Sequence, residues 1–308
     1  MFIGIIFLNV IIPILFLLVI GAGLQRKFAF NLRGISNLIT YCLMPAAVFI
    51  NLYETEIEVQ VLFEIIGYLL TFSLLLIVVT AMLSKLLSLN KGESAIFKNG
   101  ITLINSGNYG IPVSQLIFQA NPLGVSIQII VMVFQNILTY TYGMYNLISA
   151  TKSGLGILKS LLKMPIIHAM ILGSILNALQ VPIPKFIWIP ISHLADAFLA
   201  IALILLGAQL AQIQLRTIIN RTILVSSIGR LIMGPTVSLF LIYLFGLDGI
   251  VAQSLFIASS FPTSRNSSTL ALEYDVYPDL AAQTVLFTTV LSAITVTFVV
   301  YLSTILFV

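Results

Sequence analysis

Apolar stretches long enough to cross a lipid bilayer follow one another along almost the whole chain. A helix needs about 20 mostly apolar residues to span the hydrocarbon core. Of the 308 residues, 59% are hydrophobic and only 8% are charged, and the mean hydropathy is +1.13. The polar stretches between the apolar ones are too short to form a separate soluble domain. We therefore expect an integral membrane protein built from α-helices.

Counting the apolar stretches predicts ten spans and an all-α polytopic membrane fold. The spans cover approximately residues 2–24, 34–53, 60–84, 94–119, 123–148, 164–180, 185–212, 221–246, 248–274 and 279–307. The first span is not expected to be a cleavable signal peptide, because its positive charges follow the apolar core instead of preceding it.

Lysine and arginine residues are concentrated in alternate loops. The loops after spans one, three, five and seven hold eleven of them, whereas the other loops hold Lys185 alone. The positive-inside rule then predicts the cytoplasmic (inner) membrane with both chain termini on its extracytoplasmic side. The net charge of +4 follows from this loop asymmetry, so it does not indicate nucleic-acid binding. Membrane lipids are the expected surroundings.

A short basic segment, residues 151–163, divides the chain into residues 1–150 and residues 164–308, with five spans in each half. Because five is odd, the second half enters the membrane from the opposite side, which predicts two inverted repeats. The fourth span of each half is interrupted by polar residues and proline, in ITLINSGNYGIPVSQLIF at 101–118 and IASSFPTSRNSSTLALEYD at 257–275. Non-helical backbone at membrane depth is tolerated only where protein buries it or where it lines a polar cavity. The two broken spans therefore predict a central binding site.

The candidate site residues lie in these two interruptions. Glycines there permit a crossing segment to approach closely, a proline suits the first turn of a half-helix, and asparagine amides can serve the backbone or a ligand. The half-helix ends carry partial charges that hold ions or anionic groups. The predicted substrate-binding residues are Asn105, Ser106, Gly107, Asn108, Gly110, Pro112, Pro262, Thr263, Arg265, Asn266 and Ser267.

Three motifs carry a resemblance to a known family. They are NSGNYGIP at 105–112, LILLGAQLA at 203–211 and FPTSRNSSTLALEYDVYPDLAAQTVLF at 261–287. With these motifs the chain resembles the auxin efflux carrier family of bacterial and plant transporters. The resemblance extends over the whole chain in length, number of spans and placement of the motifs. The plant members carry a long cytoplasmic loop between the halves, so regulation through such a loop is not expected in this chain.

The resemblance implies a ten-span fold shared with bile-acid and sodium/proton transporters, in which spans four and nine cross. It also implies a homodimer, elevator-like motion, and transport of small organic anions such as carboxylates. By this similarity Asn105, Gly110 and Pro112 fall on the first crossover, and Pro262, Asn266 and Ser267 fall on the second. Spans one, two, six and seven would form the scaffold, and spans three to five and eight to ten would move as one block.

Arg265 departs from the small or apolar residue expected in the second crossover. An arginine inside the membrane is costly unless it faces a cavity or a partner. Three interpretations stay open: the guanidinium attracts an anionic substrate, takes the place of a coupling sodium, or pairs with a buried carboxylate such as Asp196 in span seven. Asp196 is either a proton carrier or, as we favour, part of a structural pair. For Arg230 in span eight we favour a structural role, and the alternative is a reach toward the cytoplasmic side or a carboxylate.

Secondary transport of small organic anions, either auxin-like or malate- or malonate-like carboxylates, is the predicted function. The alternative is a sodium-coupled symporter of the bile-acid type, while a channel, a receptor and an intramembrane enzyme are less favoured. An enzyme is not expected, because Ser106 and Ser267 have no histidine near them in the sequence. His168 and His193 share no metal-ligand spacing, so neither a metal nor another cofactor is expected.

Overall fold

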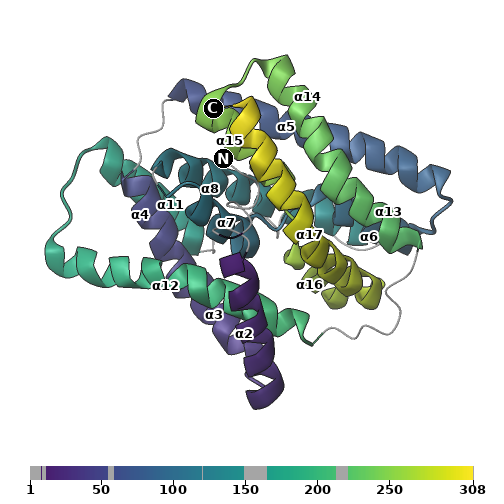
Figure 1. Cartoon of the computed structure of the whole chain (residues 1–308), viewed down its shortest axis with the longest axis horizontal. Coiled ribbons are helices and arrows are strands. Elements are labelled where there is room, and N and C mark those ends of the chain that lie inside the picture. Colours follow the sequence, from purple (N-terminus) through teal and green to yellow (C-terminus); the bar gives the residue numbers. More distant parts are fainter. Residues whose placement is uncertain are drawn as a thin grey trace.

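The computed structural model describes residues 8, 12–54, 59–119, 121–148, 165–212 and 221–307, and these residues are almost entirely helical (Figure 1). The basic segment predicted at 151–163 lies outside the described residues. In chain order the α-helices and the π-helical turns (η) are α2 (Ile12–Phe28), α3 (Leu32–Leu38), η2 (Ile39–Leu43), α4 (Met44–Glu54), α5 (Val59–Leu86), α6 (Lys91–Thr102), η3 (Ser106–Gly110), α7 (Ile111–Ile117), α8 (Pro122–Leu138), η4 (Thr139–Gly143), α9 (Met144–Ile148), α11 (Pro165–Ala178), α12 (Lys185–Leu210), α13 (Arg221–Ile228), η5 (Gly229–Met233), α14 (Gly234–Phe245), α15 (Gly249–Ser259), α16 (Arg265–Glu273) and α17 (Pro278–Leu306).

Six continuous helical segments in the described part of the chain are long and apolar enough to cross a membrane. They are Leu32–Glu54, Gln60–Leu86, Pro122–Leu147, Lys185–Leu210, Arg221–Phe245 and Pro278–Leu306. Two shorter apolar helices are Pro165–Ala178 and Gly249–Ser259. The prediction of an all-α polytopic membrane protein is confirmed at this level, and the count of ten spans stays a prediction.

The helices pack in two groups, which we name the α12 group and the α17 group. The α12 group consists of α2, α3, η2, α4, α11 and α12, in which α2 and α4 pack against α12, and α11 packs against α4 (Figure 1). The α17 group consists of α5 to α9 with α13 to α17, together with their π-helical turns. The groups meet where α4 contacts α8 and where α12 contacts η3 and α7.

Two glycines bring α2 and α12 into close contact. A Cβ atom added at Gly21 would overlap the carbonyl group of Ile204, and one added at Gly207 would overlap the carbonyl group of Leu18. Small residues allow helix backbones to approach in this way inside a membrane. Gly207 belongs to the motif LILLGAQLA at 203–211, and this close contact explains a small residue at its position.

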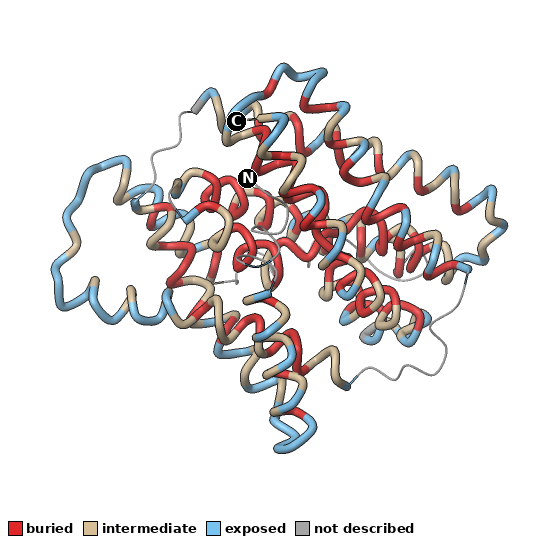
Figure 2. Tube along the Cα trace, viewed as in Figure 1, coloured by how far each residue is buried: buried red, intermediate tan, exposed pale blue. Residues whose placement is uncertain are grey.

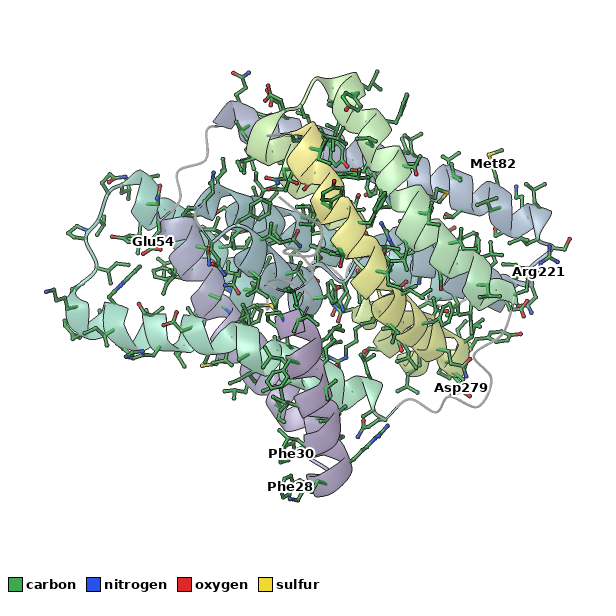
Figure 3. All side chains as sticks on the ribbon, in the orientation of Figure 1. Phe28, Phe30, Glu54, Met82, Arg221 and Asp279 are labelled. Atoms are coloured by element: carbon green, nitrogen blue, oxygen red, sulfur yellow. The ribbon has the colours of Figure 1, made fainter. Side chains whose placement is uncertain are left out.

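Burial and charge follow the pattern of a protein with a lipid-facing surface. Buried residues concentrate in the middle of the molecule, and the outer faces carry exposed apolar side chains such as Phe16, Leu70 and Phe186 (Figure 2). The labelled charged side chains lie at helix ends on the periphery, with Glu54 on one side and Arg221 and Asp279 on the other (Figure 3). Apolar surface belongs in lipid and charge belongs at its borders.

Candidate binding site

Two broken helices cross at the centre of the molecule. The first break separates α6, which ends at Thr102, from η3 and α7, and the second separates α15, which ends at Ser259, from α16. The extended residues of the two breaks pair in an antiparallel bridge between Ile104 and Thr263. The flanking bonds run from the Asn105 N–H to the Pro262 carbonyl and from the Ser264 N–H to the Leu103 carbonyl, both 2.8 Å. The predicted crossing of the two interruptions is therefore present.

Among the described residues, two backbone N–H groups at the crossing have no backbone acceptor and donate instead to side chains of two other helices. The Ile104 N–H donates to Oε1 of Gln135 on α8 at 3.1 Å, and the Thr263 N–H donates to the Thr288 hydroxyl on α17 at 3.2 Å. An unpaired backbone group at this depth would cost several kcal/mol. These two side chains allow extended backbone to persist inside an otherwise apolar protein.

The glycines of the first break have different surroundings. A Cβ atom added at Gly110 would overlap Nε2 of Gln128 and lie 2.9 Å from the Phe261 ring, so Gly110 permits the close approach to the second crossover. A Cβ atom at Gly107 would lie 3.5 Å from the Met132 sulfur, an ordinary contact. The expectation that Gly107, like Gly110, permits the close approach of the crossing segment was wrong, because Gly107 faces Met132 of α8 and Met44 of α4. Pro112 lies in the first turn of α7, where its missing N–H is harmless.

A cavity of about 150 Å³ lies on one side of the crossing. Six of the predicted site residues line it: Asn105, Ser106, Gly107, Asn108, Arg265 and Asn266. Its other walls come from both helix groups, with Ser36, Thr40, Met44 and Ile166 from the α12 group and Ile104, Met132, Gln135, Asn136, Thr139, Tyr140 and Ser264 from the α17 group. The cavity therefore lies between the two groups.

The other five predicted site residues do not line this cavity. Gly110, Pro112 and Pro262 lie within the packed crossing. Thr263 and Ser267 lie on its far side with Asn99, Gly100 and Thr284, and the Thr263 hydroxyl donates to the Gly100 carbonyl at 2.6 Å. The crossing thus has an open side, at the cavity, and a closed side, where α6 and α15 end.

Two buried amides on the open side have free hydrogen-bond donors. Nδ2 of Asn105, a residue that is 5% exposed, and Nε2 of Gln135, which is 2% exposed, have no partner in the described structure. The orientation of the Gln135 amide is fixed, because its oxygen accepts the Ile104 N–H. Arg265 adds a cation, and none of the described residues that line the cavity is acidic. This arrangement suits a ligand that accepts hydrogen bonds and carries negative charge.

The closed side contains a fully buried guanidinium group. Arg230, in η5, is 0% exposed and donates from Nη1 to the Ile101 carbonyl at 2.5 Å and from Nη2 to the Ser259 carbonyl. These carbonyls belong to the last turns of α6 and α15. These contacts agree with the structural role favoured for Arg230. The alternative of a carboxylate partner is not found among the described residues, because the guanidinium contacts the ends of both broken helices.

The proposed pairing of Arg265 with Asp196 is also not found. Asp196 is exposed on α12, on the same face as exposed His193 three residues earlier, and it does not line the cavity. Among the described residues no ion pair joins it to Arg265. Helical periodicity explains the error, because the buried face of α12 carries Phe198, Ala202 and Leu205, and Asp196 points away from that face.

Sequence reasoning missed the cavity residues contributed by uninterrupted spans. Two of them are amides in the apolar run of α8, Gln135 and Asn136, and this polarity was an available signal. A third amide of α8, Gln128, does not line the cavity and donates to the Ser106 carbonyl at 2.8 Å. Two of the cavity walls are formed by the π-helical turns η2 and η4, through Thr40, Thr139 and Tyr140. Such turns occur frequently at functional sites, but their position is not readable from the sequence. No group of three His, Cys, Asp or Glu side chains suited to a metal ion occurs within the described ranges.

The fold and the site define a polytopic helical membrane protein in which two broken helices cross beside a polar cavity, an arrangement typical of secondary transporters. A family model described as membrane transport protein matches residues 6–157 and 149–300. The chain belongs to this family, which is that of the auxin efflux carriers, and the resemblance of its motifs is thereby confirmed. A comparison with curated proteins finds no match.

Proposed function

We propose that the protein is a secondary transporter of small organic anions and that it holds the carboxylate of its substrate in the cavity beside the crossing. The observation that carries this proposal is the combination of free donors with a cation: Asn105 Nδ2, Gln135 Nε2 and the Arg265 guanidinium border one cavity. A carboxylate accepts several hydrogen bonds at once, and its bonds to charged donors are short and strong. A neutral or cationic solute satisfies this donor set less well.

The size of the cavity favours a small substrate. A cavity of about 150 Å³ has room for a molecule near the size of benzene. A short-chain mono- or dicarboxylate of the malonate or malate class fits this volume better than an auxin-like acid with a fused aromatic ring. The amide groups of Asn108 and Asn136 add partners for a second polar end of such a molecule.

The position of the cavity between the two helix groups supports alternating access by an elevator-like motion. Its walls come from both helix groups, so a displacement of one group against the other would open the cavity first to one side and then to the other. In this proposal the α12 group is the scaffold of a homodimer, and the α17 group carries the substrate. Both crossovers belong to the carrying group, since η3, α7, α15 and α16 pack mainly within it.

The proposed membrane orientation keeps both termini outside the cytoplasm. Arg221 and Asp279 lie on one side of the molecule and Glu54 lies on the other (Figure 3). This distribution supports the orientation that the loop charges indicate, with the Arg221 side facing the cytoplasm of the inner membrane. Labelling in intact cells of a single cysteine, introduced at position 54 or at position 221 of a protein in which Cys42 is replaced, tests it, and equal labelling of both would contradict it.

Ligand binding by the purified protein is the direct test of the function. The melting temperature is measured with a series of mono- and dicarboxylates and, as matched controls, with their uncharged amides, first in choline buffer and then in sodium buffer. A ligand that binds the folded state raises this temperature by mass action. We expect a small carboxylate to stabilise the protein and its amide to fail, and uptake of the same radiolabelled acid into proteoliposomes to saturate. Equal stabilisation by acid and amide would refute the anion site, and uptake without saturation or counterflow would indicate a channel.

A further inference from the structure

We propose that Arg230 is a built-in cation of the crossing, which occupies the position where a bound inorganic ion would otherwise be needed, and that the protein therefore folds and binds its anion without sodium. The part of this inference that concerns Arg230 and the helix ends stands on the geometry alone. The part that concerns the coupling of transport rests on the proposed function.

The carbonyl groups at the end of α6 show why a cation is needed. A helix leaves its last four carbonyls without intrahelical donors. In α6 the Asn99 carbonyl receives the Leu103 N–H at 3.0 Å, and the Gly100 carbonyl receives the Thr263 hydroxyl at 2.6 Å. The Ile101 carbonyl receives Nη1 of Arg230.

The end of α15 repeats this arrangement. The Phe256 carbonyl receives the Ser259 hydroxyl at 2.6 Å, and the Ile257 carbonyl receives the Ser260 hydroxyl at 2.6 Å. The Ser259 carbonyl receives Nη2 of Arg230. One guanidinium thus bridges the final turns of two helices that belong to different halves of the chain.

The charges of these groups balance. The C-terminal end of a helix carries roughly half a negative elementary charge, so two converging ends amount to about one. Arg230 supplies one positive charge, and its planar fork has two donors that diverge toward two acceptors. Half-helix C-terminal ends in secondary transporters are places where a coupling cation is coordinated. Here the side chain of the protein makes those contacts.

The surroundings of Arg230 are shaped for the guanidinium group. A Cβ atom added at Gly234, one helical turn further on, would overlap Nη2 of Arg230 and lie 3.0 Å from the Ser259 carbonyl oxygen. One turn earlier, Ser226 has a buried hydroxyl without a partner, and this hydroxyl would lie 2.5 Å from a Cβ atom added at Gly100 of α6. If the guanidinium is removed, its space is bordered by the Ile101 and Ser259 carbonyls, which are oxygen ligands for a small cation.

The experiment compares the wild-type protein with Arg230→Ala in millimolar chloride salts of choline, sodium, lithium, potassium and guanidinium at equal ionic strength. We expect the melting temperature of the wild type to be the same in all five salts. Arg230→Ala should melt roughly 10 °C lower in choline, because two buried helix ends lose their cation. It should recover at least half of this loss in sodium, lithium or guanidinium salt, whereas choline is too large to enter. Arg265→Gln is the matched control, and its melting temperature should not depend on the cation.

Three results would overturn the inference. The first is a saturable rise of the wild-type melting temperature in sodium relative to choline. The second is an Arg230→Ala protein that folds but whose melting temperature rises with each small cation no more than that of the wild type does. The third is an Arg230→Ala protein as stable in choline as the wild type. If this variant is not recovered in folded form, Arg230→Lys replaces it: its single ammonium keeps the charge but loses the fork, so it should melt below the wild type and remain independent of sodium, and a sodium requirement would count against the proposal.

These results separate the inference from the proposed function, since the melting measurements need no substrate. Small cations could rescue Arg230→Ala while the wild type binds no carboxylate. That result would support the role of Arg230 as a built-in cation and contradict the proposal of an anion transporter. Conversely, the wild type could bind a carboxylate equally well in choline and in sodium while no cation rescues Arg230→Ala. That result would support the transporter and contradict the role of Arg230.

Discussion

The two sides of the crossing differ in what surrounds their polar groups. The closed side is packed, and the Thr102 and Ser226 hydroxyls and Arg230 Nε are buried there without a partner among the described residues, whereas the polar groups of the open side border a cavity. On the closed side, the final carbonyls of α6 and α15 find partners in hydroxyl groups and in the Arg230 guanidinium. On the open side, the first residues of η3 and α16 border a cavity, and two buried amides keep free donors. A buried polar group without a partner is costly unless a ligand or water supplies one. We infer from this difference that the closed side stabilises the fold, and we propose the open side as the binding side.

The two arginines express the same contrast. Arg230 is 0% exposed and fixed by two backbone carbonyls, whereas Arg265 is partly exposed and borders the cavity. Both are cations at membrane depth, where charge is expensive. We therefore expect substitutions near Arg230 to affect the free energy of unfolding, and substitutions near Arg265 to affect the affinity for the anion.

The largest effect is expected for Gly234→Ala on the closed side. The new methyl group would overlap Nη2 of Arg230 and crowd the Ser259 carbonyl. Displacement of the guanidinium leaves a buried charge without its partners, so the loss should be about 3–5 kcal/mol of unfolding free energy. Chemical denaturation of the purified variant measures this loss.

Gly23→Ala is the matched control for that prediction, because a Cβ atom at Gly23 of α2 meets nothing within 4 Å. It should leave the stability unchanged or raise it slightly, since alanine is the better helix former by roughly 1 kcal/mol. Equal destabilisation by both substitutions would show that the surroundings of Arg230 are not special. Loss of carboxylate affinity by Gly234→Ala, with stability kept, would reverse the roles assigned to the two sides.

Arg265→Gln should have the next largest effect, and it should act on binding. Charge-assisted hydrogen bonds contribute about 1.5–3 kcal/mol, so the affinity for the carboxylate should fall by roughly 10- to 100-fold. The melting temperature without ligand should stay near that of the wild type, because Arg265 has no ion-pair partner among the described residues. Isothermal titration with the carboxylate and with its amide measures the change. A variant that loses affinity for both ligands alike would show that the arginine does not recognise charge.

Asn105→Ala tests the free amide donor of the open side. The cavity loses a neutral donor, so the affinity should fall by about 1–2 kcal/mol, less than for Arg265→Gln. Asn266→Ala is the companion variant from the second crossover, and its effect should be of similar size because Asn266 also lines the cavity. Unchanged affinity in a folded Asn105→Ala protein would remove this residue from the site, and the Gln135 amide would remain as the buried free donor.

The residues were sufficient to predict the two helix breaks, and the resemblance to the family implied that they cross, but neither predicted the two sides of the crossing. Proline, glycine and polar residues in NSGNYGIP and FPTSRN are conspicuous in an apolar chain, because such residues break a helix where exposed backbone is least tolerated. Which half-helix end meets which side chain depends on contacts between residues far apart in the chain. Arg230 and Ile101, for example, are separated by 129 positions. No local pattern encodes such a contact.

For the uninterrupted helices, the sequence predicted that they cross the membrane but not which of their side chains contact the crossing or the cavity. Gln135 and Thr288 stand in apolar runs whose hydropathy predicts only that they cross the membrane, and their bonds to Ile104 and Thr263 became visible only in the structure. Gln135 was within reach of sequence reasoning, since an amide in a span is unusual. Thr288 was not, because a threonine commonly bonds to its own helix, as this one also does with the Thr284 carbonyl at 2.8 Å.

Asp196→Asn is expected to have the smallest effect, and it sharpens the comparison by testing the partner once predicted for Arg265. Asp196 is exposed on α12 and does not border the cavity, so neutralising it should change the affinity for the carboxylate by less than about twofold and the stability by about 0.5 kcal/mol or less. A double-mutant cycle with Arg265→Gln extends the test, because the effects of residues that do not touch add within about 0.5 kcal/mol. A coupling energy above about 1 kcal/mol would restore the ion pair between the two residues. Arg265 would then be a structural cation like Arg230, and the contrast between the two sides of the crossing would be lost.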